Sequence, residues 1–78
     1  MPTLGCIGPY RIFFFASDRE EPPQVHVSRD DAAAKVWLAP VRLATKFGFN
    51  RREVVRVVRI VATNRGRFEE AWHEFFSR

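Results

Sequence analysis

The sequence has few of the residues that form disulfides, metal clusters or phosphate-binding loops. Its single cysteine, Cys6, excludes an internal disulfide and leaves no cysteine pair for a zinc site. Its four glycines form no Gly-rich phosphate loop and no nucleophile elbow. Because His26, His73 and Cys6 lack the spacing of metal ligands, we expect neither a metal nor another cofactor.

Long apolar runs are also missing, since no stretch approaches the roughly 20 residues that span a bilayer. Met1 to Pro9 lacks the basic start and the apolar segment of a secretory signal. We therefore expect no membrane contact and a cytoplasmic location. A chain of 78 residues, 46% of them hydrophobic, predicts a single domain over residues 1–78, whose small core favours a partner protein or a homodimer.

Acidic residues are scarce between residues 42 and 67, where eight lysines and arginines are accompanied by Glu53 alone. Three of these arginines follow one another at steps of four and three residues, which places them on one side of a helix. Such a basic stripe favours an anionic partner, although a solvated helix face would have the same pattern. The residues predicted to bind RNA, DNA or another anion are Arg42, Arg52, Arg56 and Arg59.

Short alternating segments between turn residues predict an antiparallel sheet. The polar loop before the second strand ends in Pro22-Pro23, which favours extended backbone. Asp30-Asp31 suits a two-residue hairpin loop. We interpret residues 41–49 as a short helical turn, because their apolar residues recur at helical spacing. The predicted strands lie at about 10–16, 25–28 and 33–38.

One long helix is predicted after the sheet. Asn50 is a good N-cap, and Glu53 three residues later completes a capping box. Apolar residues then recur at three- and four-residue steps as far as Phe76, with an interruption only around Asn64-Arg65-Gly66. We therefore expect an α+β fold, in which a small three-stranded antiparallel sheet packs against a helix at about 51–76 that is kinked, if at all, near Gly66.

The hairpin loop also predicts which residues lie opposite each other in the sheet. With a two-residue loop, His26 lies opposite Lys35 and Gln24 lies opposite Trp37. A single helix layer leaves this face of the sheet uncovered, and exposed aromatic residues there mark an interaction surface. Two sets alternate along the first strand, and which set is buried stays open: Arg11, Phe13 and Phe15, or Tyr10, Ile12 and Phe14. The residues predicted to bind a partner are Arg11, Phe13, Phe15, Gln24 and Trp37.

His26 and Lys35 are the candidates for catalysis. An imidazole titrates near neutral pH, and an ammonium group offsets developing negative charge, so the pair suits RNA cleavage. The alternative is an ordinary strand histidine that packs beside Trp37. The residue pattern leaves open whether the chain is an enzyme.

Three motifs, in this order, resemble a family of short bacterial proteins catalogued as a domain of unknown function. Its members have a Pro-Pro-His-x-His-Val motif, a strand that ends in Phe/Trp-Leu-x-Pro-Val-Arg-Leu-Ala and a helix that ends in Glu-Ala-Trp-x-Glu-Phe/Tyr-Phe. In this sequence the motifs lie at Pro22 to Val27, Val36 to Ala44 and Glu70 to Phe76. Gln24 stands where the family motif has its first histidine, so a two-histidine pair is missing and any chemical role rests on His26.

The resemblance implies a function. Family members often form one half of a two-protein bacterial cassette that is similar to toxin–antitoxin modules. Our leading hypothesis is a component of such a module that binds a small cognate protein encoded nearby, with RNA as the target of its action. The alternative is a non-catalytic module, either an antitoxin or an adaptor, that binds nucleic acid or another protein.

Overall fold

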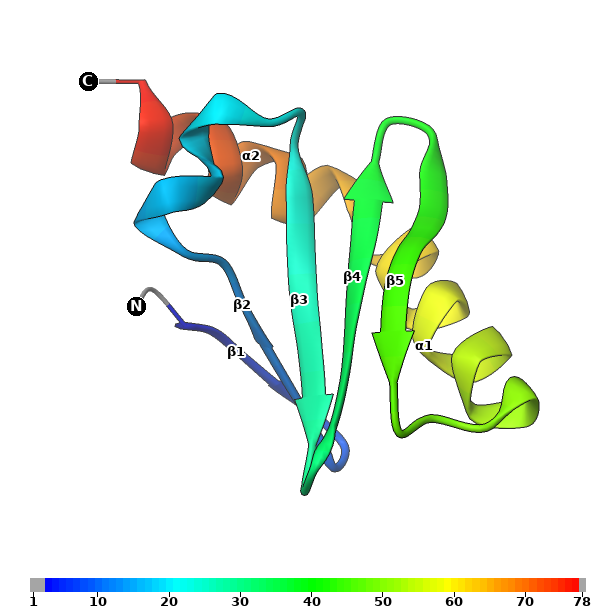
Figure 1. The fold of residues 1–78 in the computed structure, drawn as a ribbon. Helices are drawn as coiled ribbons and strands as arrows, with labels where there is room; N and C mark the ends of the chain where they lie inside the picture. The colour runs from blue at the N-terminus through cyan, green and yellow to red at the C-terminus, as the bar shows by residue number, and fades with distance from the viewer. Residues whose placement is uncertain (1–2, 78) are drawn as a thin grey trace.

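The computed structural model describes residues 3–77, which form a five-stranded antiparallel sheet with two helices on one face (Figure 1). The strands follow one another in the sheet as they do in the chain. The elements are β1 (Thr3–Ile7), β2 (Tyr10–Phe13), η1 (Ala16–Glu20, a 3-10 helix), β3 (Gln24–Arg29), β4 (Ala32–Leu38), β5 (Val41–Phe47), α1 (Arg51–Thr63) and α2 (Arg65–Phe76).

The prediction of a three-stranded sheet is wrong, because it missed both edge strands, although the class is still α+β. β1 joins β2 through a tight turn at Gly8, whose φ of +58° a glycine adopts without strain. The pairing of β1 is irregular between Thr3 and Gly5. A strand this irregular has little of the two-residue alternation by which strands are recognised in a sequence.

Residues 41–47 form β5 and not the expected helical turn. Their pairing with β4 shifts by one residue, so that Leu43 lies opposite Val36 and Thr45 lies opposite Lys35. Ala44 is therefore an extra residue on β5, as in a β-bulge. The bulge interrupts the alternation of the strand, which explains why the apolar residues are spaced as in a helix.

The single long helix that we predicted is also wrong, because the chain forms two helices, α1 and α2, which are separated by a break at Asn64, within the interruption of the apolar pattern. The Asn64 side chain donates to the Ile60 carbonyl at 2.9 Å, a local bond of the kind that competes with regular helix. Beside it, Arg65 Nε donates to the Leu38 carbonyl of β4 at 2.8 Å, which holds the break against the sheet. An unbroken helix of this length would extend about 39 Å, far beyond any strand.

The register predicted for the β3–β4 hairpin is confirmed. The connection is a two-residue loop in which Asp30 has a φ of +54°, in the left-handed region that two-residue hairpin loops use. As a result, His26 lies opposite Lys35 and Gln24 lies opposite Trp37.

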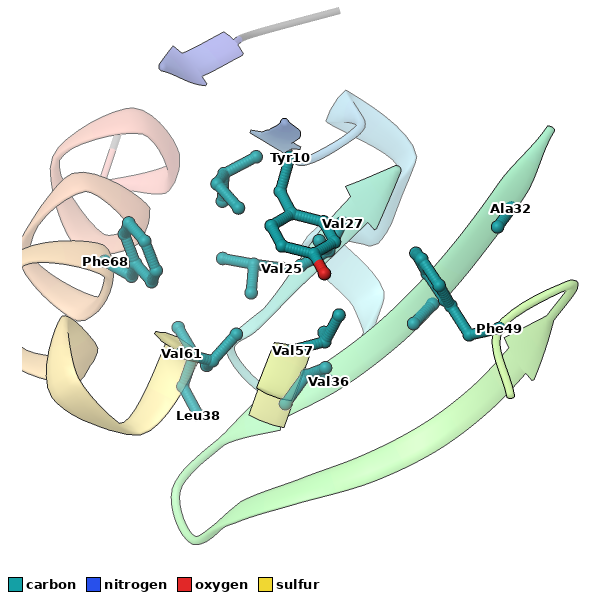
Figure 2. Packing of buried hydrophobic residues seen from close by; sticks show 12 residues of the cluster. Tyr10, Val25, Val27, Ala32, Val36, Leu38, Phe49, Val57, Val61 and Phe68 are labelled. Carbon is teal, nitrogen blue, oxygen red and sulfur yellow. The ribbon is translucent and has the colours of Figure 1, made fainter. Parts of the chain in front are cut away.

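The core lies between the sheet and the helices (Figure 2). Its centre is aliphatic, and the side chains with no exposed surface are Val25, Val27, Val36, Leu38, Val57 and Val61. The sequence left open which face of the strand predicted at about 10–16 is buried. The structure, in which this strand is β2, settles its orientation. Tyr10, Ile12 and Phe14 are buried on the helix side, and Ile12 lies opposite Val27. Arg11, Phe13 and Phe15 belong to the other face, where Phe13 lies opposite His26.

An ion pair joins the start of α1 to the sheet. Arg29 donates to both carboxylate oxygens of Glu53, at 2.6 and 2.7 Å, and Tyr10 Oη donates to the same group at 2.8 Å. The hydrogen bonds from Arg29, more than the one from Tyr10, hold the pKa of Glu53 below its usual value. Asn50 accepts the Glu53 N–H at 2.8 Å and so caps α1, as predicted. The other half of the predicted capping box does not form, because the Glu53 carboxylate accepts from Arg29 and Tyr10 instead.

Glu53→Gln is expected to lower the free energy of unfolding at neutral pH and to reduce its dependence on pH. Because the pKa of Glu53 is lowered from 4.5, its charge stabilises the fold above that pH, and this contribution is lost as the pH falls through the folded-state pKa. Urea midpoints measured from about pH 7 to about pH 3 should therefore differ most from wild type at the upper end.

The matched control is Glu70→Gln, which removes the same charge from an exposed position on α2. It should leave the midpoint nearly unchanged. Equal losses in the two variants at neutral pH would contradict the role given to the ion pair of Arg29 and Glu53.

Candidate functional site

The face of the sheet opposite the helices has no second layer within residues 3–77, and we call it the open sheet face (Figure 1). Alternation along β2 to β5 places cationic, aromatic and imidazole side chains on it. The connection between β2 and β3 adds two carboxylates, Asp18 and Glu21. The open sheet face comprises Arg11, Phe13, Phe15, Gln24, His26, Lys35, Trp37, Arg42 and Phe47.

His26 is held between two aromatic rings and a carboxylate. Its ring stacks on Phe13 with centroids 5.5 Å apart and meets the edge of Phe15 at 4.8 Å. Its Nε2 lies 3.0 Å from Oδ2 of Asp18, and the same oxygen accepts the Phe15 N–H at 2.8 Å. These contacts leave 18% of the side chain exposed and fix the orientation of the ring.

The carboxylate decides which nitrogen of His26 is free for chemistry. A carboxylate only accepts hydrogen bonds, so Nε2 of His26 carries the proton that it donates to Asp18. In the neutral ring Nδ1 is then the nitrogen that can accept a proton. An imidazole oriented in this way by a buried carboxylate can act as a general base towards a bound hydroxyl group.

Lys35, which lies opposite His26, also forms an ion pair with a residue of the β2–β3 connection. Its Nζ donates to Oε1 of Glu21 at 2.7 Å and lies 4.8 Å from the ring centroid of Trp37. The hydrogen bond from Lys35, followed by that from Gln24, holds the pKa of Glu21 below its usual value. Lys35 is therefore a partly neutralised cation and not a free one.

Gln24 has a supporting place in this site. Its side chain is fully buried, and its Nε2 donates to Oε1 of Glu21 at 2.5 Å. Its own Oε1 is buried without a hydrogen-bond partner among the residues that the structure describes. In the structure the Gln24 amide holds Glu21 in place, and contact between Gln24 and a partner stays a prediction.

Two hollows lie on the open sheet face. One has a volume of about 280 Å³ between Pro22, Trp37 and Arg42, at the end of the β4–β5 hairpin. The other, about 330 Å³, lies between His26, Lys35 and Phe47. The Phe47 side chain is 73% exposed, which is unusual for an aromatic residue. The face is thus apolar, indented and bordered by cations.

The four arginines predicted to bind an anion do not form one site. Arg42 lies opposite Trp37 on the open sheet face. Arg52, Arg56 and Arg59 are exposed on α1, which covers the other side of the sheet. Any role of Arg42 must therefore be considered apart from the α1 arginines.

Asp18 and Glu21 are the site residues that sequence reasoning missed. Both come from a polar loop, and their partners are 8 and 14 residues further along the chain. No local pattern predicts such pairs, because they depend on how the β2–β3 connection folds back over the strands.

Within residues 3–77, no three His, Cys, Asp or Glu side chains gather as a metal site would require. None of the described helices is long and apolar enough to cross a membrane.

Residues 10–73 match the family model described as a domain of unknown function, DUF4160. The chain belongs to this family. The match begins with β2 and ends within α2, so it includes His26, Lys35 and the whole β2–β3 connection. No curated protein and no solved structure matches the chain.

Asp18→Ala is expected to release the His26 ring. In the wild-type protein the bond to Asp18 should protect the Nε2 proton from exchange with water, so that an Nε2–H signal is visible in nitrogen–proton NMR spectra at neutral pH. The variant should lose this signal, whereas Asp31→Ala, at the exposed hairpin loop, should keep it. A wild-type spectrum with the proton on Nδ1 would contradict the assigned hydrogen bond.

Proposed function

We propose that this protein is the interaction component of a toxin–antitoxin-like two-protein module, and that its open sheet face binds a small cognate partner protein. The observation that carries the proposal is a sheet face with aromatic side chains and hollows, but with no covering layer among the described residues. Apolar patches bordered by polar groups on a small domain mark interaction surfaces.

The charges of the open sheet face indicate the chemistry of the partner. Arg11 and Arg42 are exposed there, and no carboxylate within residues 3–77 forms an ion pair with either. Trp and Arg are the residue types that contribute most binding energy in protein interfaces. The surface therefore suits a partner that inserts an apolar side chain beside Trp37 and surrounds it with carboxylates.

The family resemblance favours a partner encoded beside this chain, since similar proteins occur in two-protein bacterial cassettes. The competing occupant of the same face is a second copy of this chain. Two copies would place two faces that each carry the unpaired cations Arg11 and Arg42 against one another, which costs electrostatic energy. This repulsion favours an acidic partner over a homodimer.

Trp37→Ala is expected to weaken binding of the partner by about 30-fold or more, the effect of losing a central aromatic anchor. The measurement is isothermal titration of the purified chain with the product of its neighbouring gene. Growth on expression of each protein alone, and of both together, tests the toxin–antitoxin relation. One protein alone should inhibit growth, and co-expression should relieve the inhibition.

The control is Val55→Ala, which truncates an exposed apolar side chain on α1, away from the open sheet face. It should leave the affinity unchanged. Equal losses for both variants, or a stable dimer of the chain alone that Trp37→Ala dissociates, would contradict the proposal.

RNA cleavage is the second candidate function, and the orientation of His26 by Asp18 favours it. In this candidate Nδ1 of His26 removes the proton of the ribose 2′-hydroxyl, and the 2′-oxygen attacks the adjacent phosphorus while the bond from phosphorus to the 5′-oxygen breaks. The leaving 5′-oxygen takes a proton from solvent, and Lys35 offsets charge on the phosphate. The partner protein would then restrain the activity by covering the open sheet face.

His26→Gln tests this candidate, because the amide can still donate to Asp18 but cannot titrate. Loss of a general base should lower the rate of RNA cleavage by about 100-fold or more and relieve growth inhibition. Ser28→Ala, on the same strand and face as His26, should retain both the RNA cleavage rate and the growth inhibition of the wild-type protein. Unchanged growth inhibition in a folded His26→Gln protein would remove the enzymatic candidate and leave the binding proposal intact.

A further inference from the structure

The outer side of α1 is a second, separate surface with unusual composition. Four arginines surround Val55 there, and together they border an open hollow of about 540 Å³. All of them are exposed, and Val55 itself is 52% exposed. No carboxylate within residues 3–77 forms an ion pair with any of the four. The arginines are Arg51, Arg52, Arg56 and Arg59, and we call this surface the arginine face of α1.

The only carboxylate of α1 is turned away from this surface. Glu53 is 14% exposed and directs its carboxylate to Arg29 and Tyr10 of the sheet. The inward orientation of Glu53 leaves the arginine face with a high density of positive charge. A soluble helix more often balances such charges with acidic residues one turn away.

We propose that the arginine face of α1 binds duplex DNA, with the helix in the major groove. A positive surface without neutralising carboxylates is complementary to phosphates. The major groove of B-DNA is about 12 Å wide and admits an α-helix, whose diameter with side chains is about 10–12 Å. From Arg52 to Arg59 the helix rises about 10 Å, which spreads its arginines over two helical turns along the groove.

The composition of the arginine face of α1 favours duplex DNA over single-stranded nucleic acid and over duplex RNA. Single strands bind proteins by stacking bases on aromatic rings, and no aromatic residue borders the hollow. The major groove of A-form RNA is too narrow for side chains to enter. Val55, apolar and exposed between the arginines, suits contact with thymine methyl groups in the major groove.

This surface is independent of the proposed partner site, because α1 and the open sheet face lie on opposite sides of the sheet (Figure 1). The protein can therefore hold a partner and DNA at the same time. Failure of one proposal does not affect the other.

Fluorescence anisotropy with a labelled DNA duplex of about 20 base pairs tests the proposal. If all four arginines contact phosphates, the slope of log affinity against log salt concentration should be about −3.6. The affinity should then fall about a hundredfold as the salt concentration rises from about 50 to about 200 mM. Arg52→Gln and Arg56→Gln should each reduce the magnitude of the slope by about 0.9. The single strand of the same sequence and the equivalent RNA duplex should bind more weakly than duplex DNA.

Arg67→Gln is the matched control, since it removes one exposed arginine from α2. It should leave the slope unchanged, and circular dichroism should show that all three variants remain folded. The proposal is overturned by the absence of binding at about 50 mM salt, by an equal loss of slope in Arg67→Gln, or by single-stranded DNA or duplex RNA binding as tightly as duplex DNA.

Discussion

The arrangement of both helices on one side of the sheet is the constraint on which the rest of this structure depends. The valines of β3 and β4, together with Ala32, Ala34 and Leu38, lie on that side, and α1 and α2 bury apolar side chains such as Val57, Val61 and Phe68 against them. The opposite side keeps Arg11, Phe15, Arg42 and Phe47 exposed. A surface for a partner is therefore a direct consequence of how the core is formed.

Apolar burial has no direction, and polar contacts decide how the helices lie. Glu53 joins the start of α1 to Arg29 and Tyr10, and Arg65 joins the start of α2 to the Leu38 carbonyl. The same orientation of Glu53 also removes negative charge from the outer side of α1. The ion pair of Arg29 and Glu53 thus contributes to the stability of the fold and also to the positive charge on the outer side of the same helix.

The β2–β3 connection gives the open sheet face its chemical character. It supplies Asp18, which forms a hydrogen bond with His26, and Glu21, which forms one with Lys35. An oriented imidazole is suited to proton transfer, and the same contacts make it a rigid element of a binding surface. Both proposed functions therefore use the His26 ring in the orientation fixed by Asp18. RNA cleavage requires His26 to take up a proton, whereas partner binding does not.

The sequence by itself determined the β3–β4 register and the start of α1, because the chemistry of each is local. A two-residue loop requires a left-handed conformation that Asp30 tolerates, and the cap requires only Asn50 and the N–H of Glu53. Only the tertiary structure decided that β5 is a strand, that the helix breaks at Asn64 and that His26 is held by Asp18. In each of these cases a contact with another segment contributes: the pairing with β4, the Leu38 carbonyl that accepts from Arg65, or the Asp18 carboxylate. The spacing of residues within one segment does not predict such contacts.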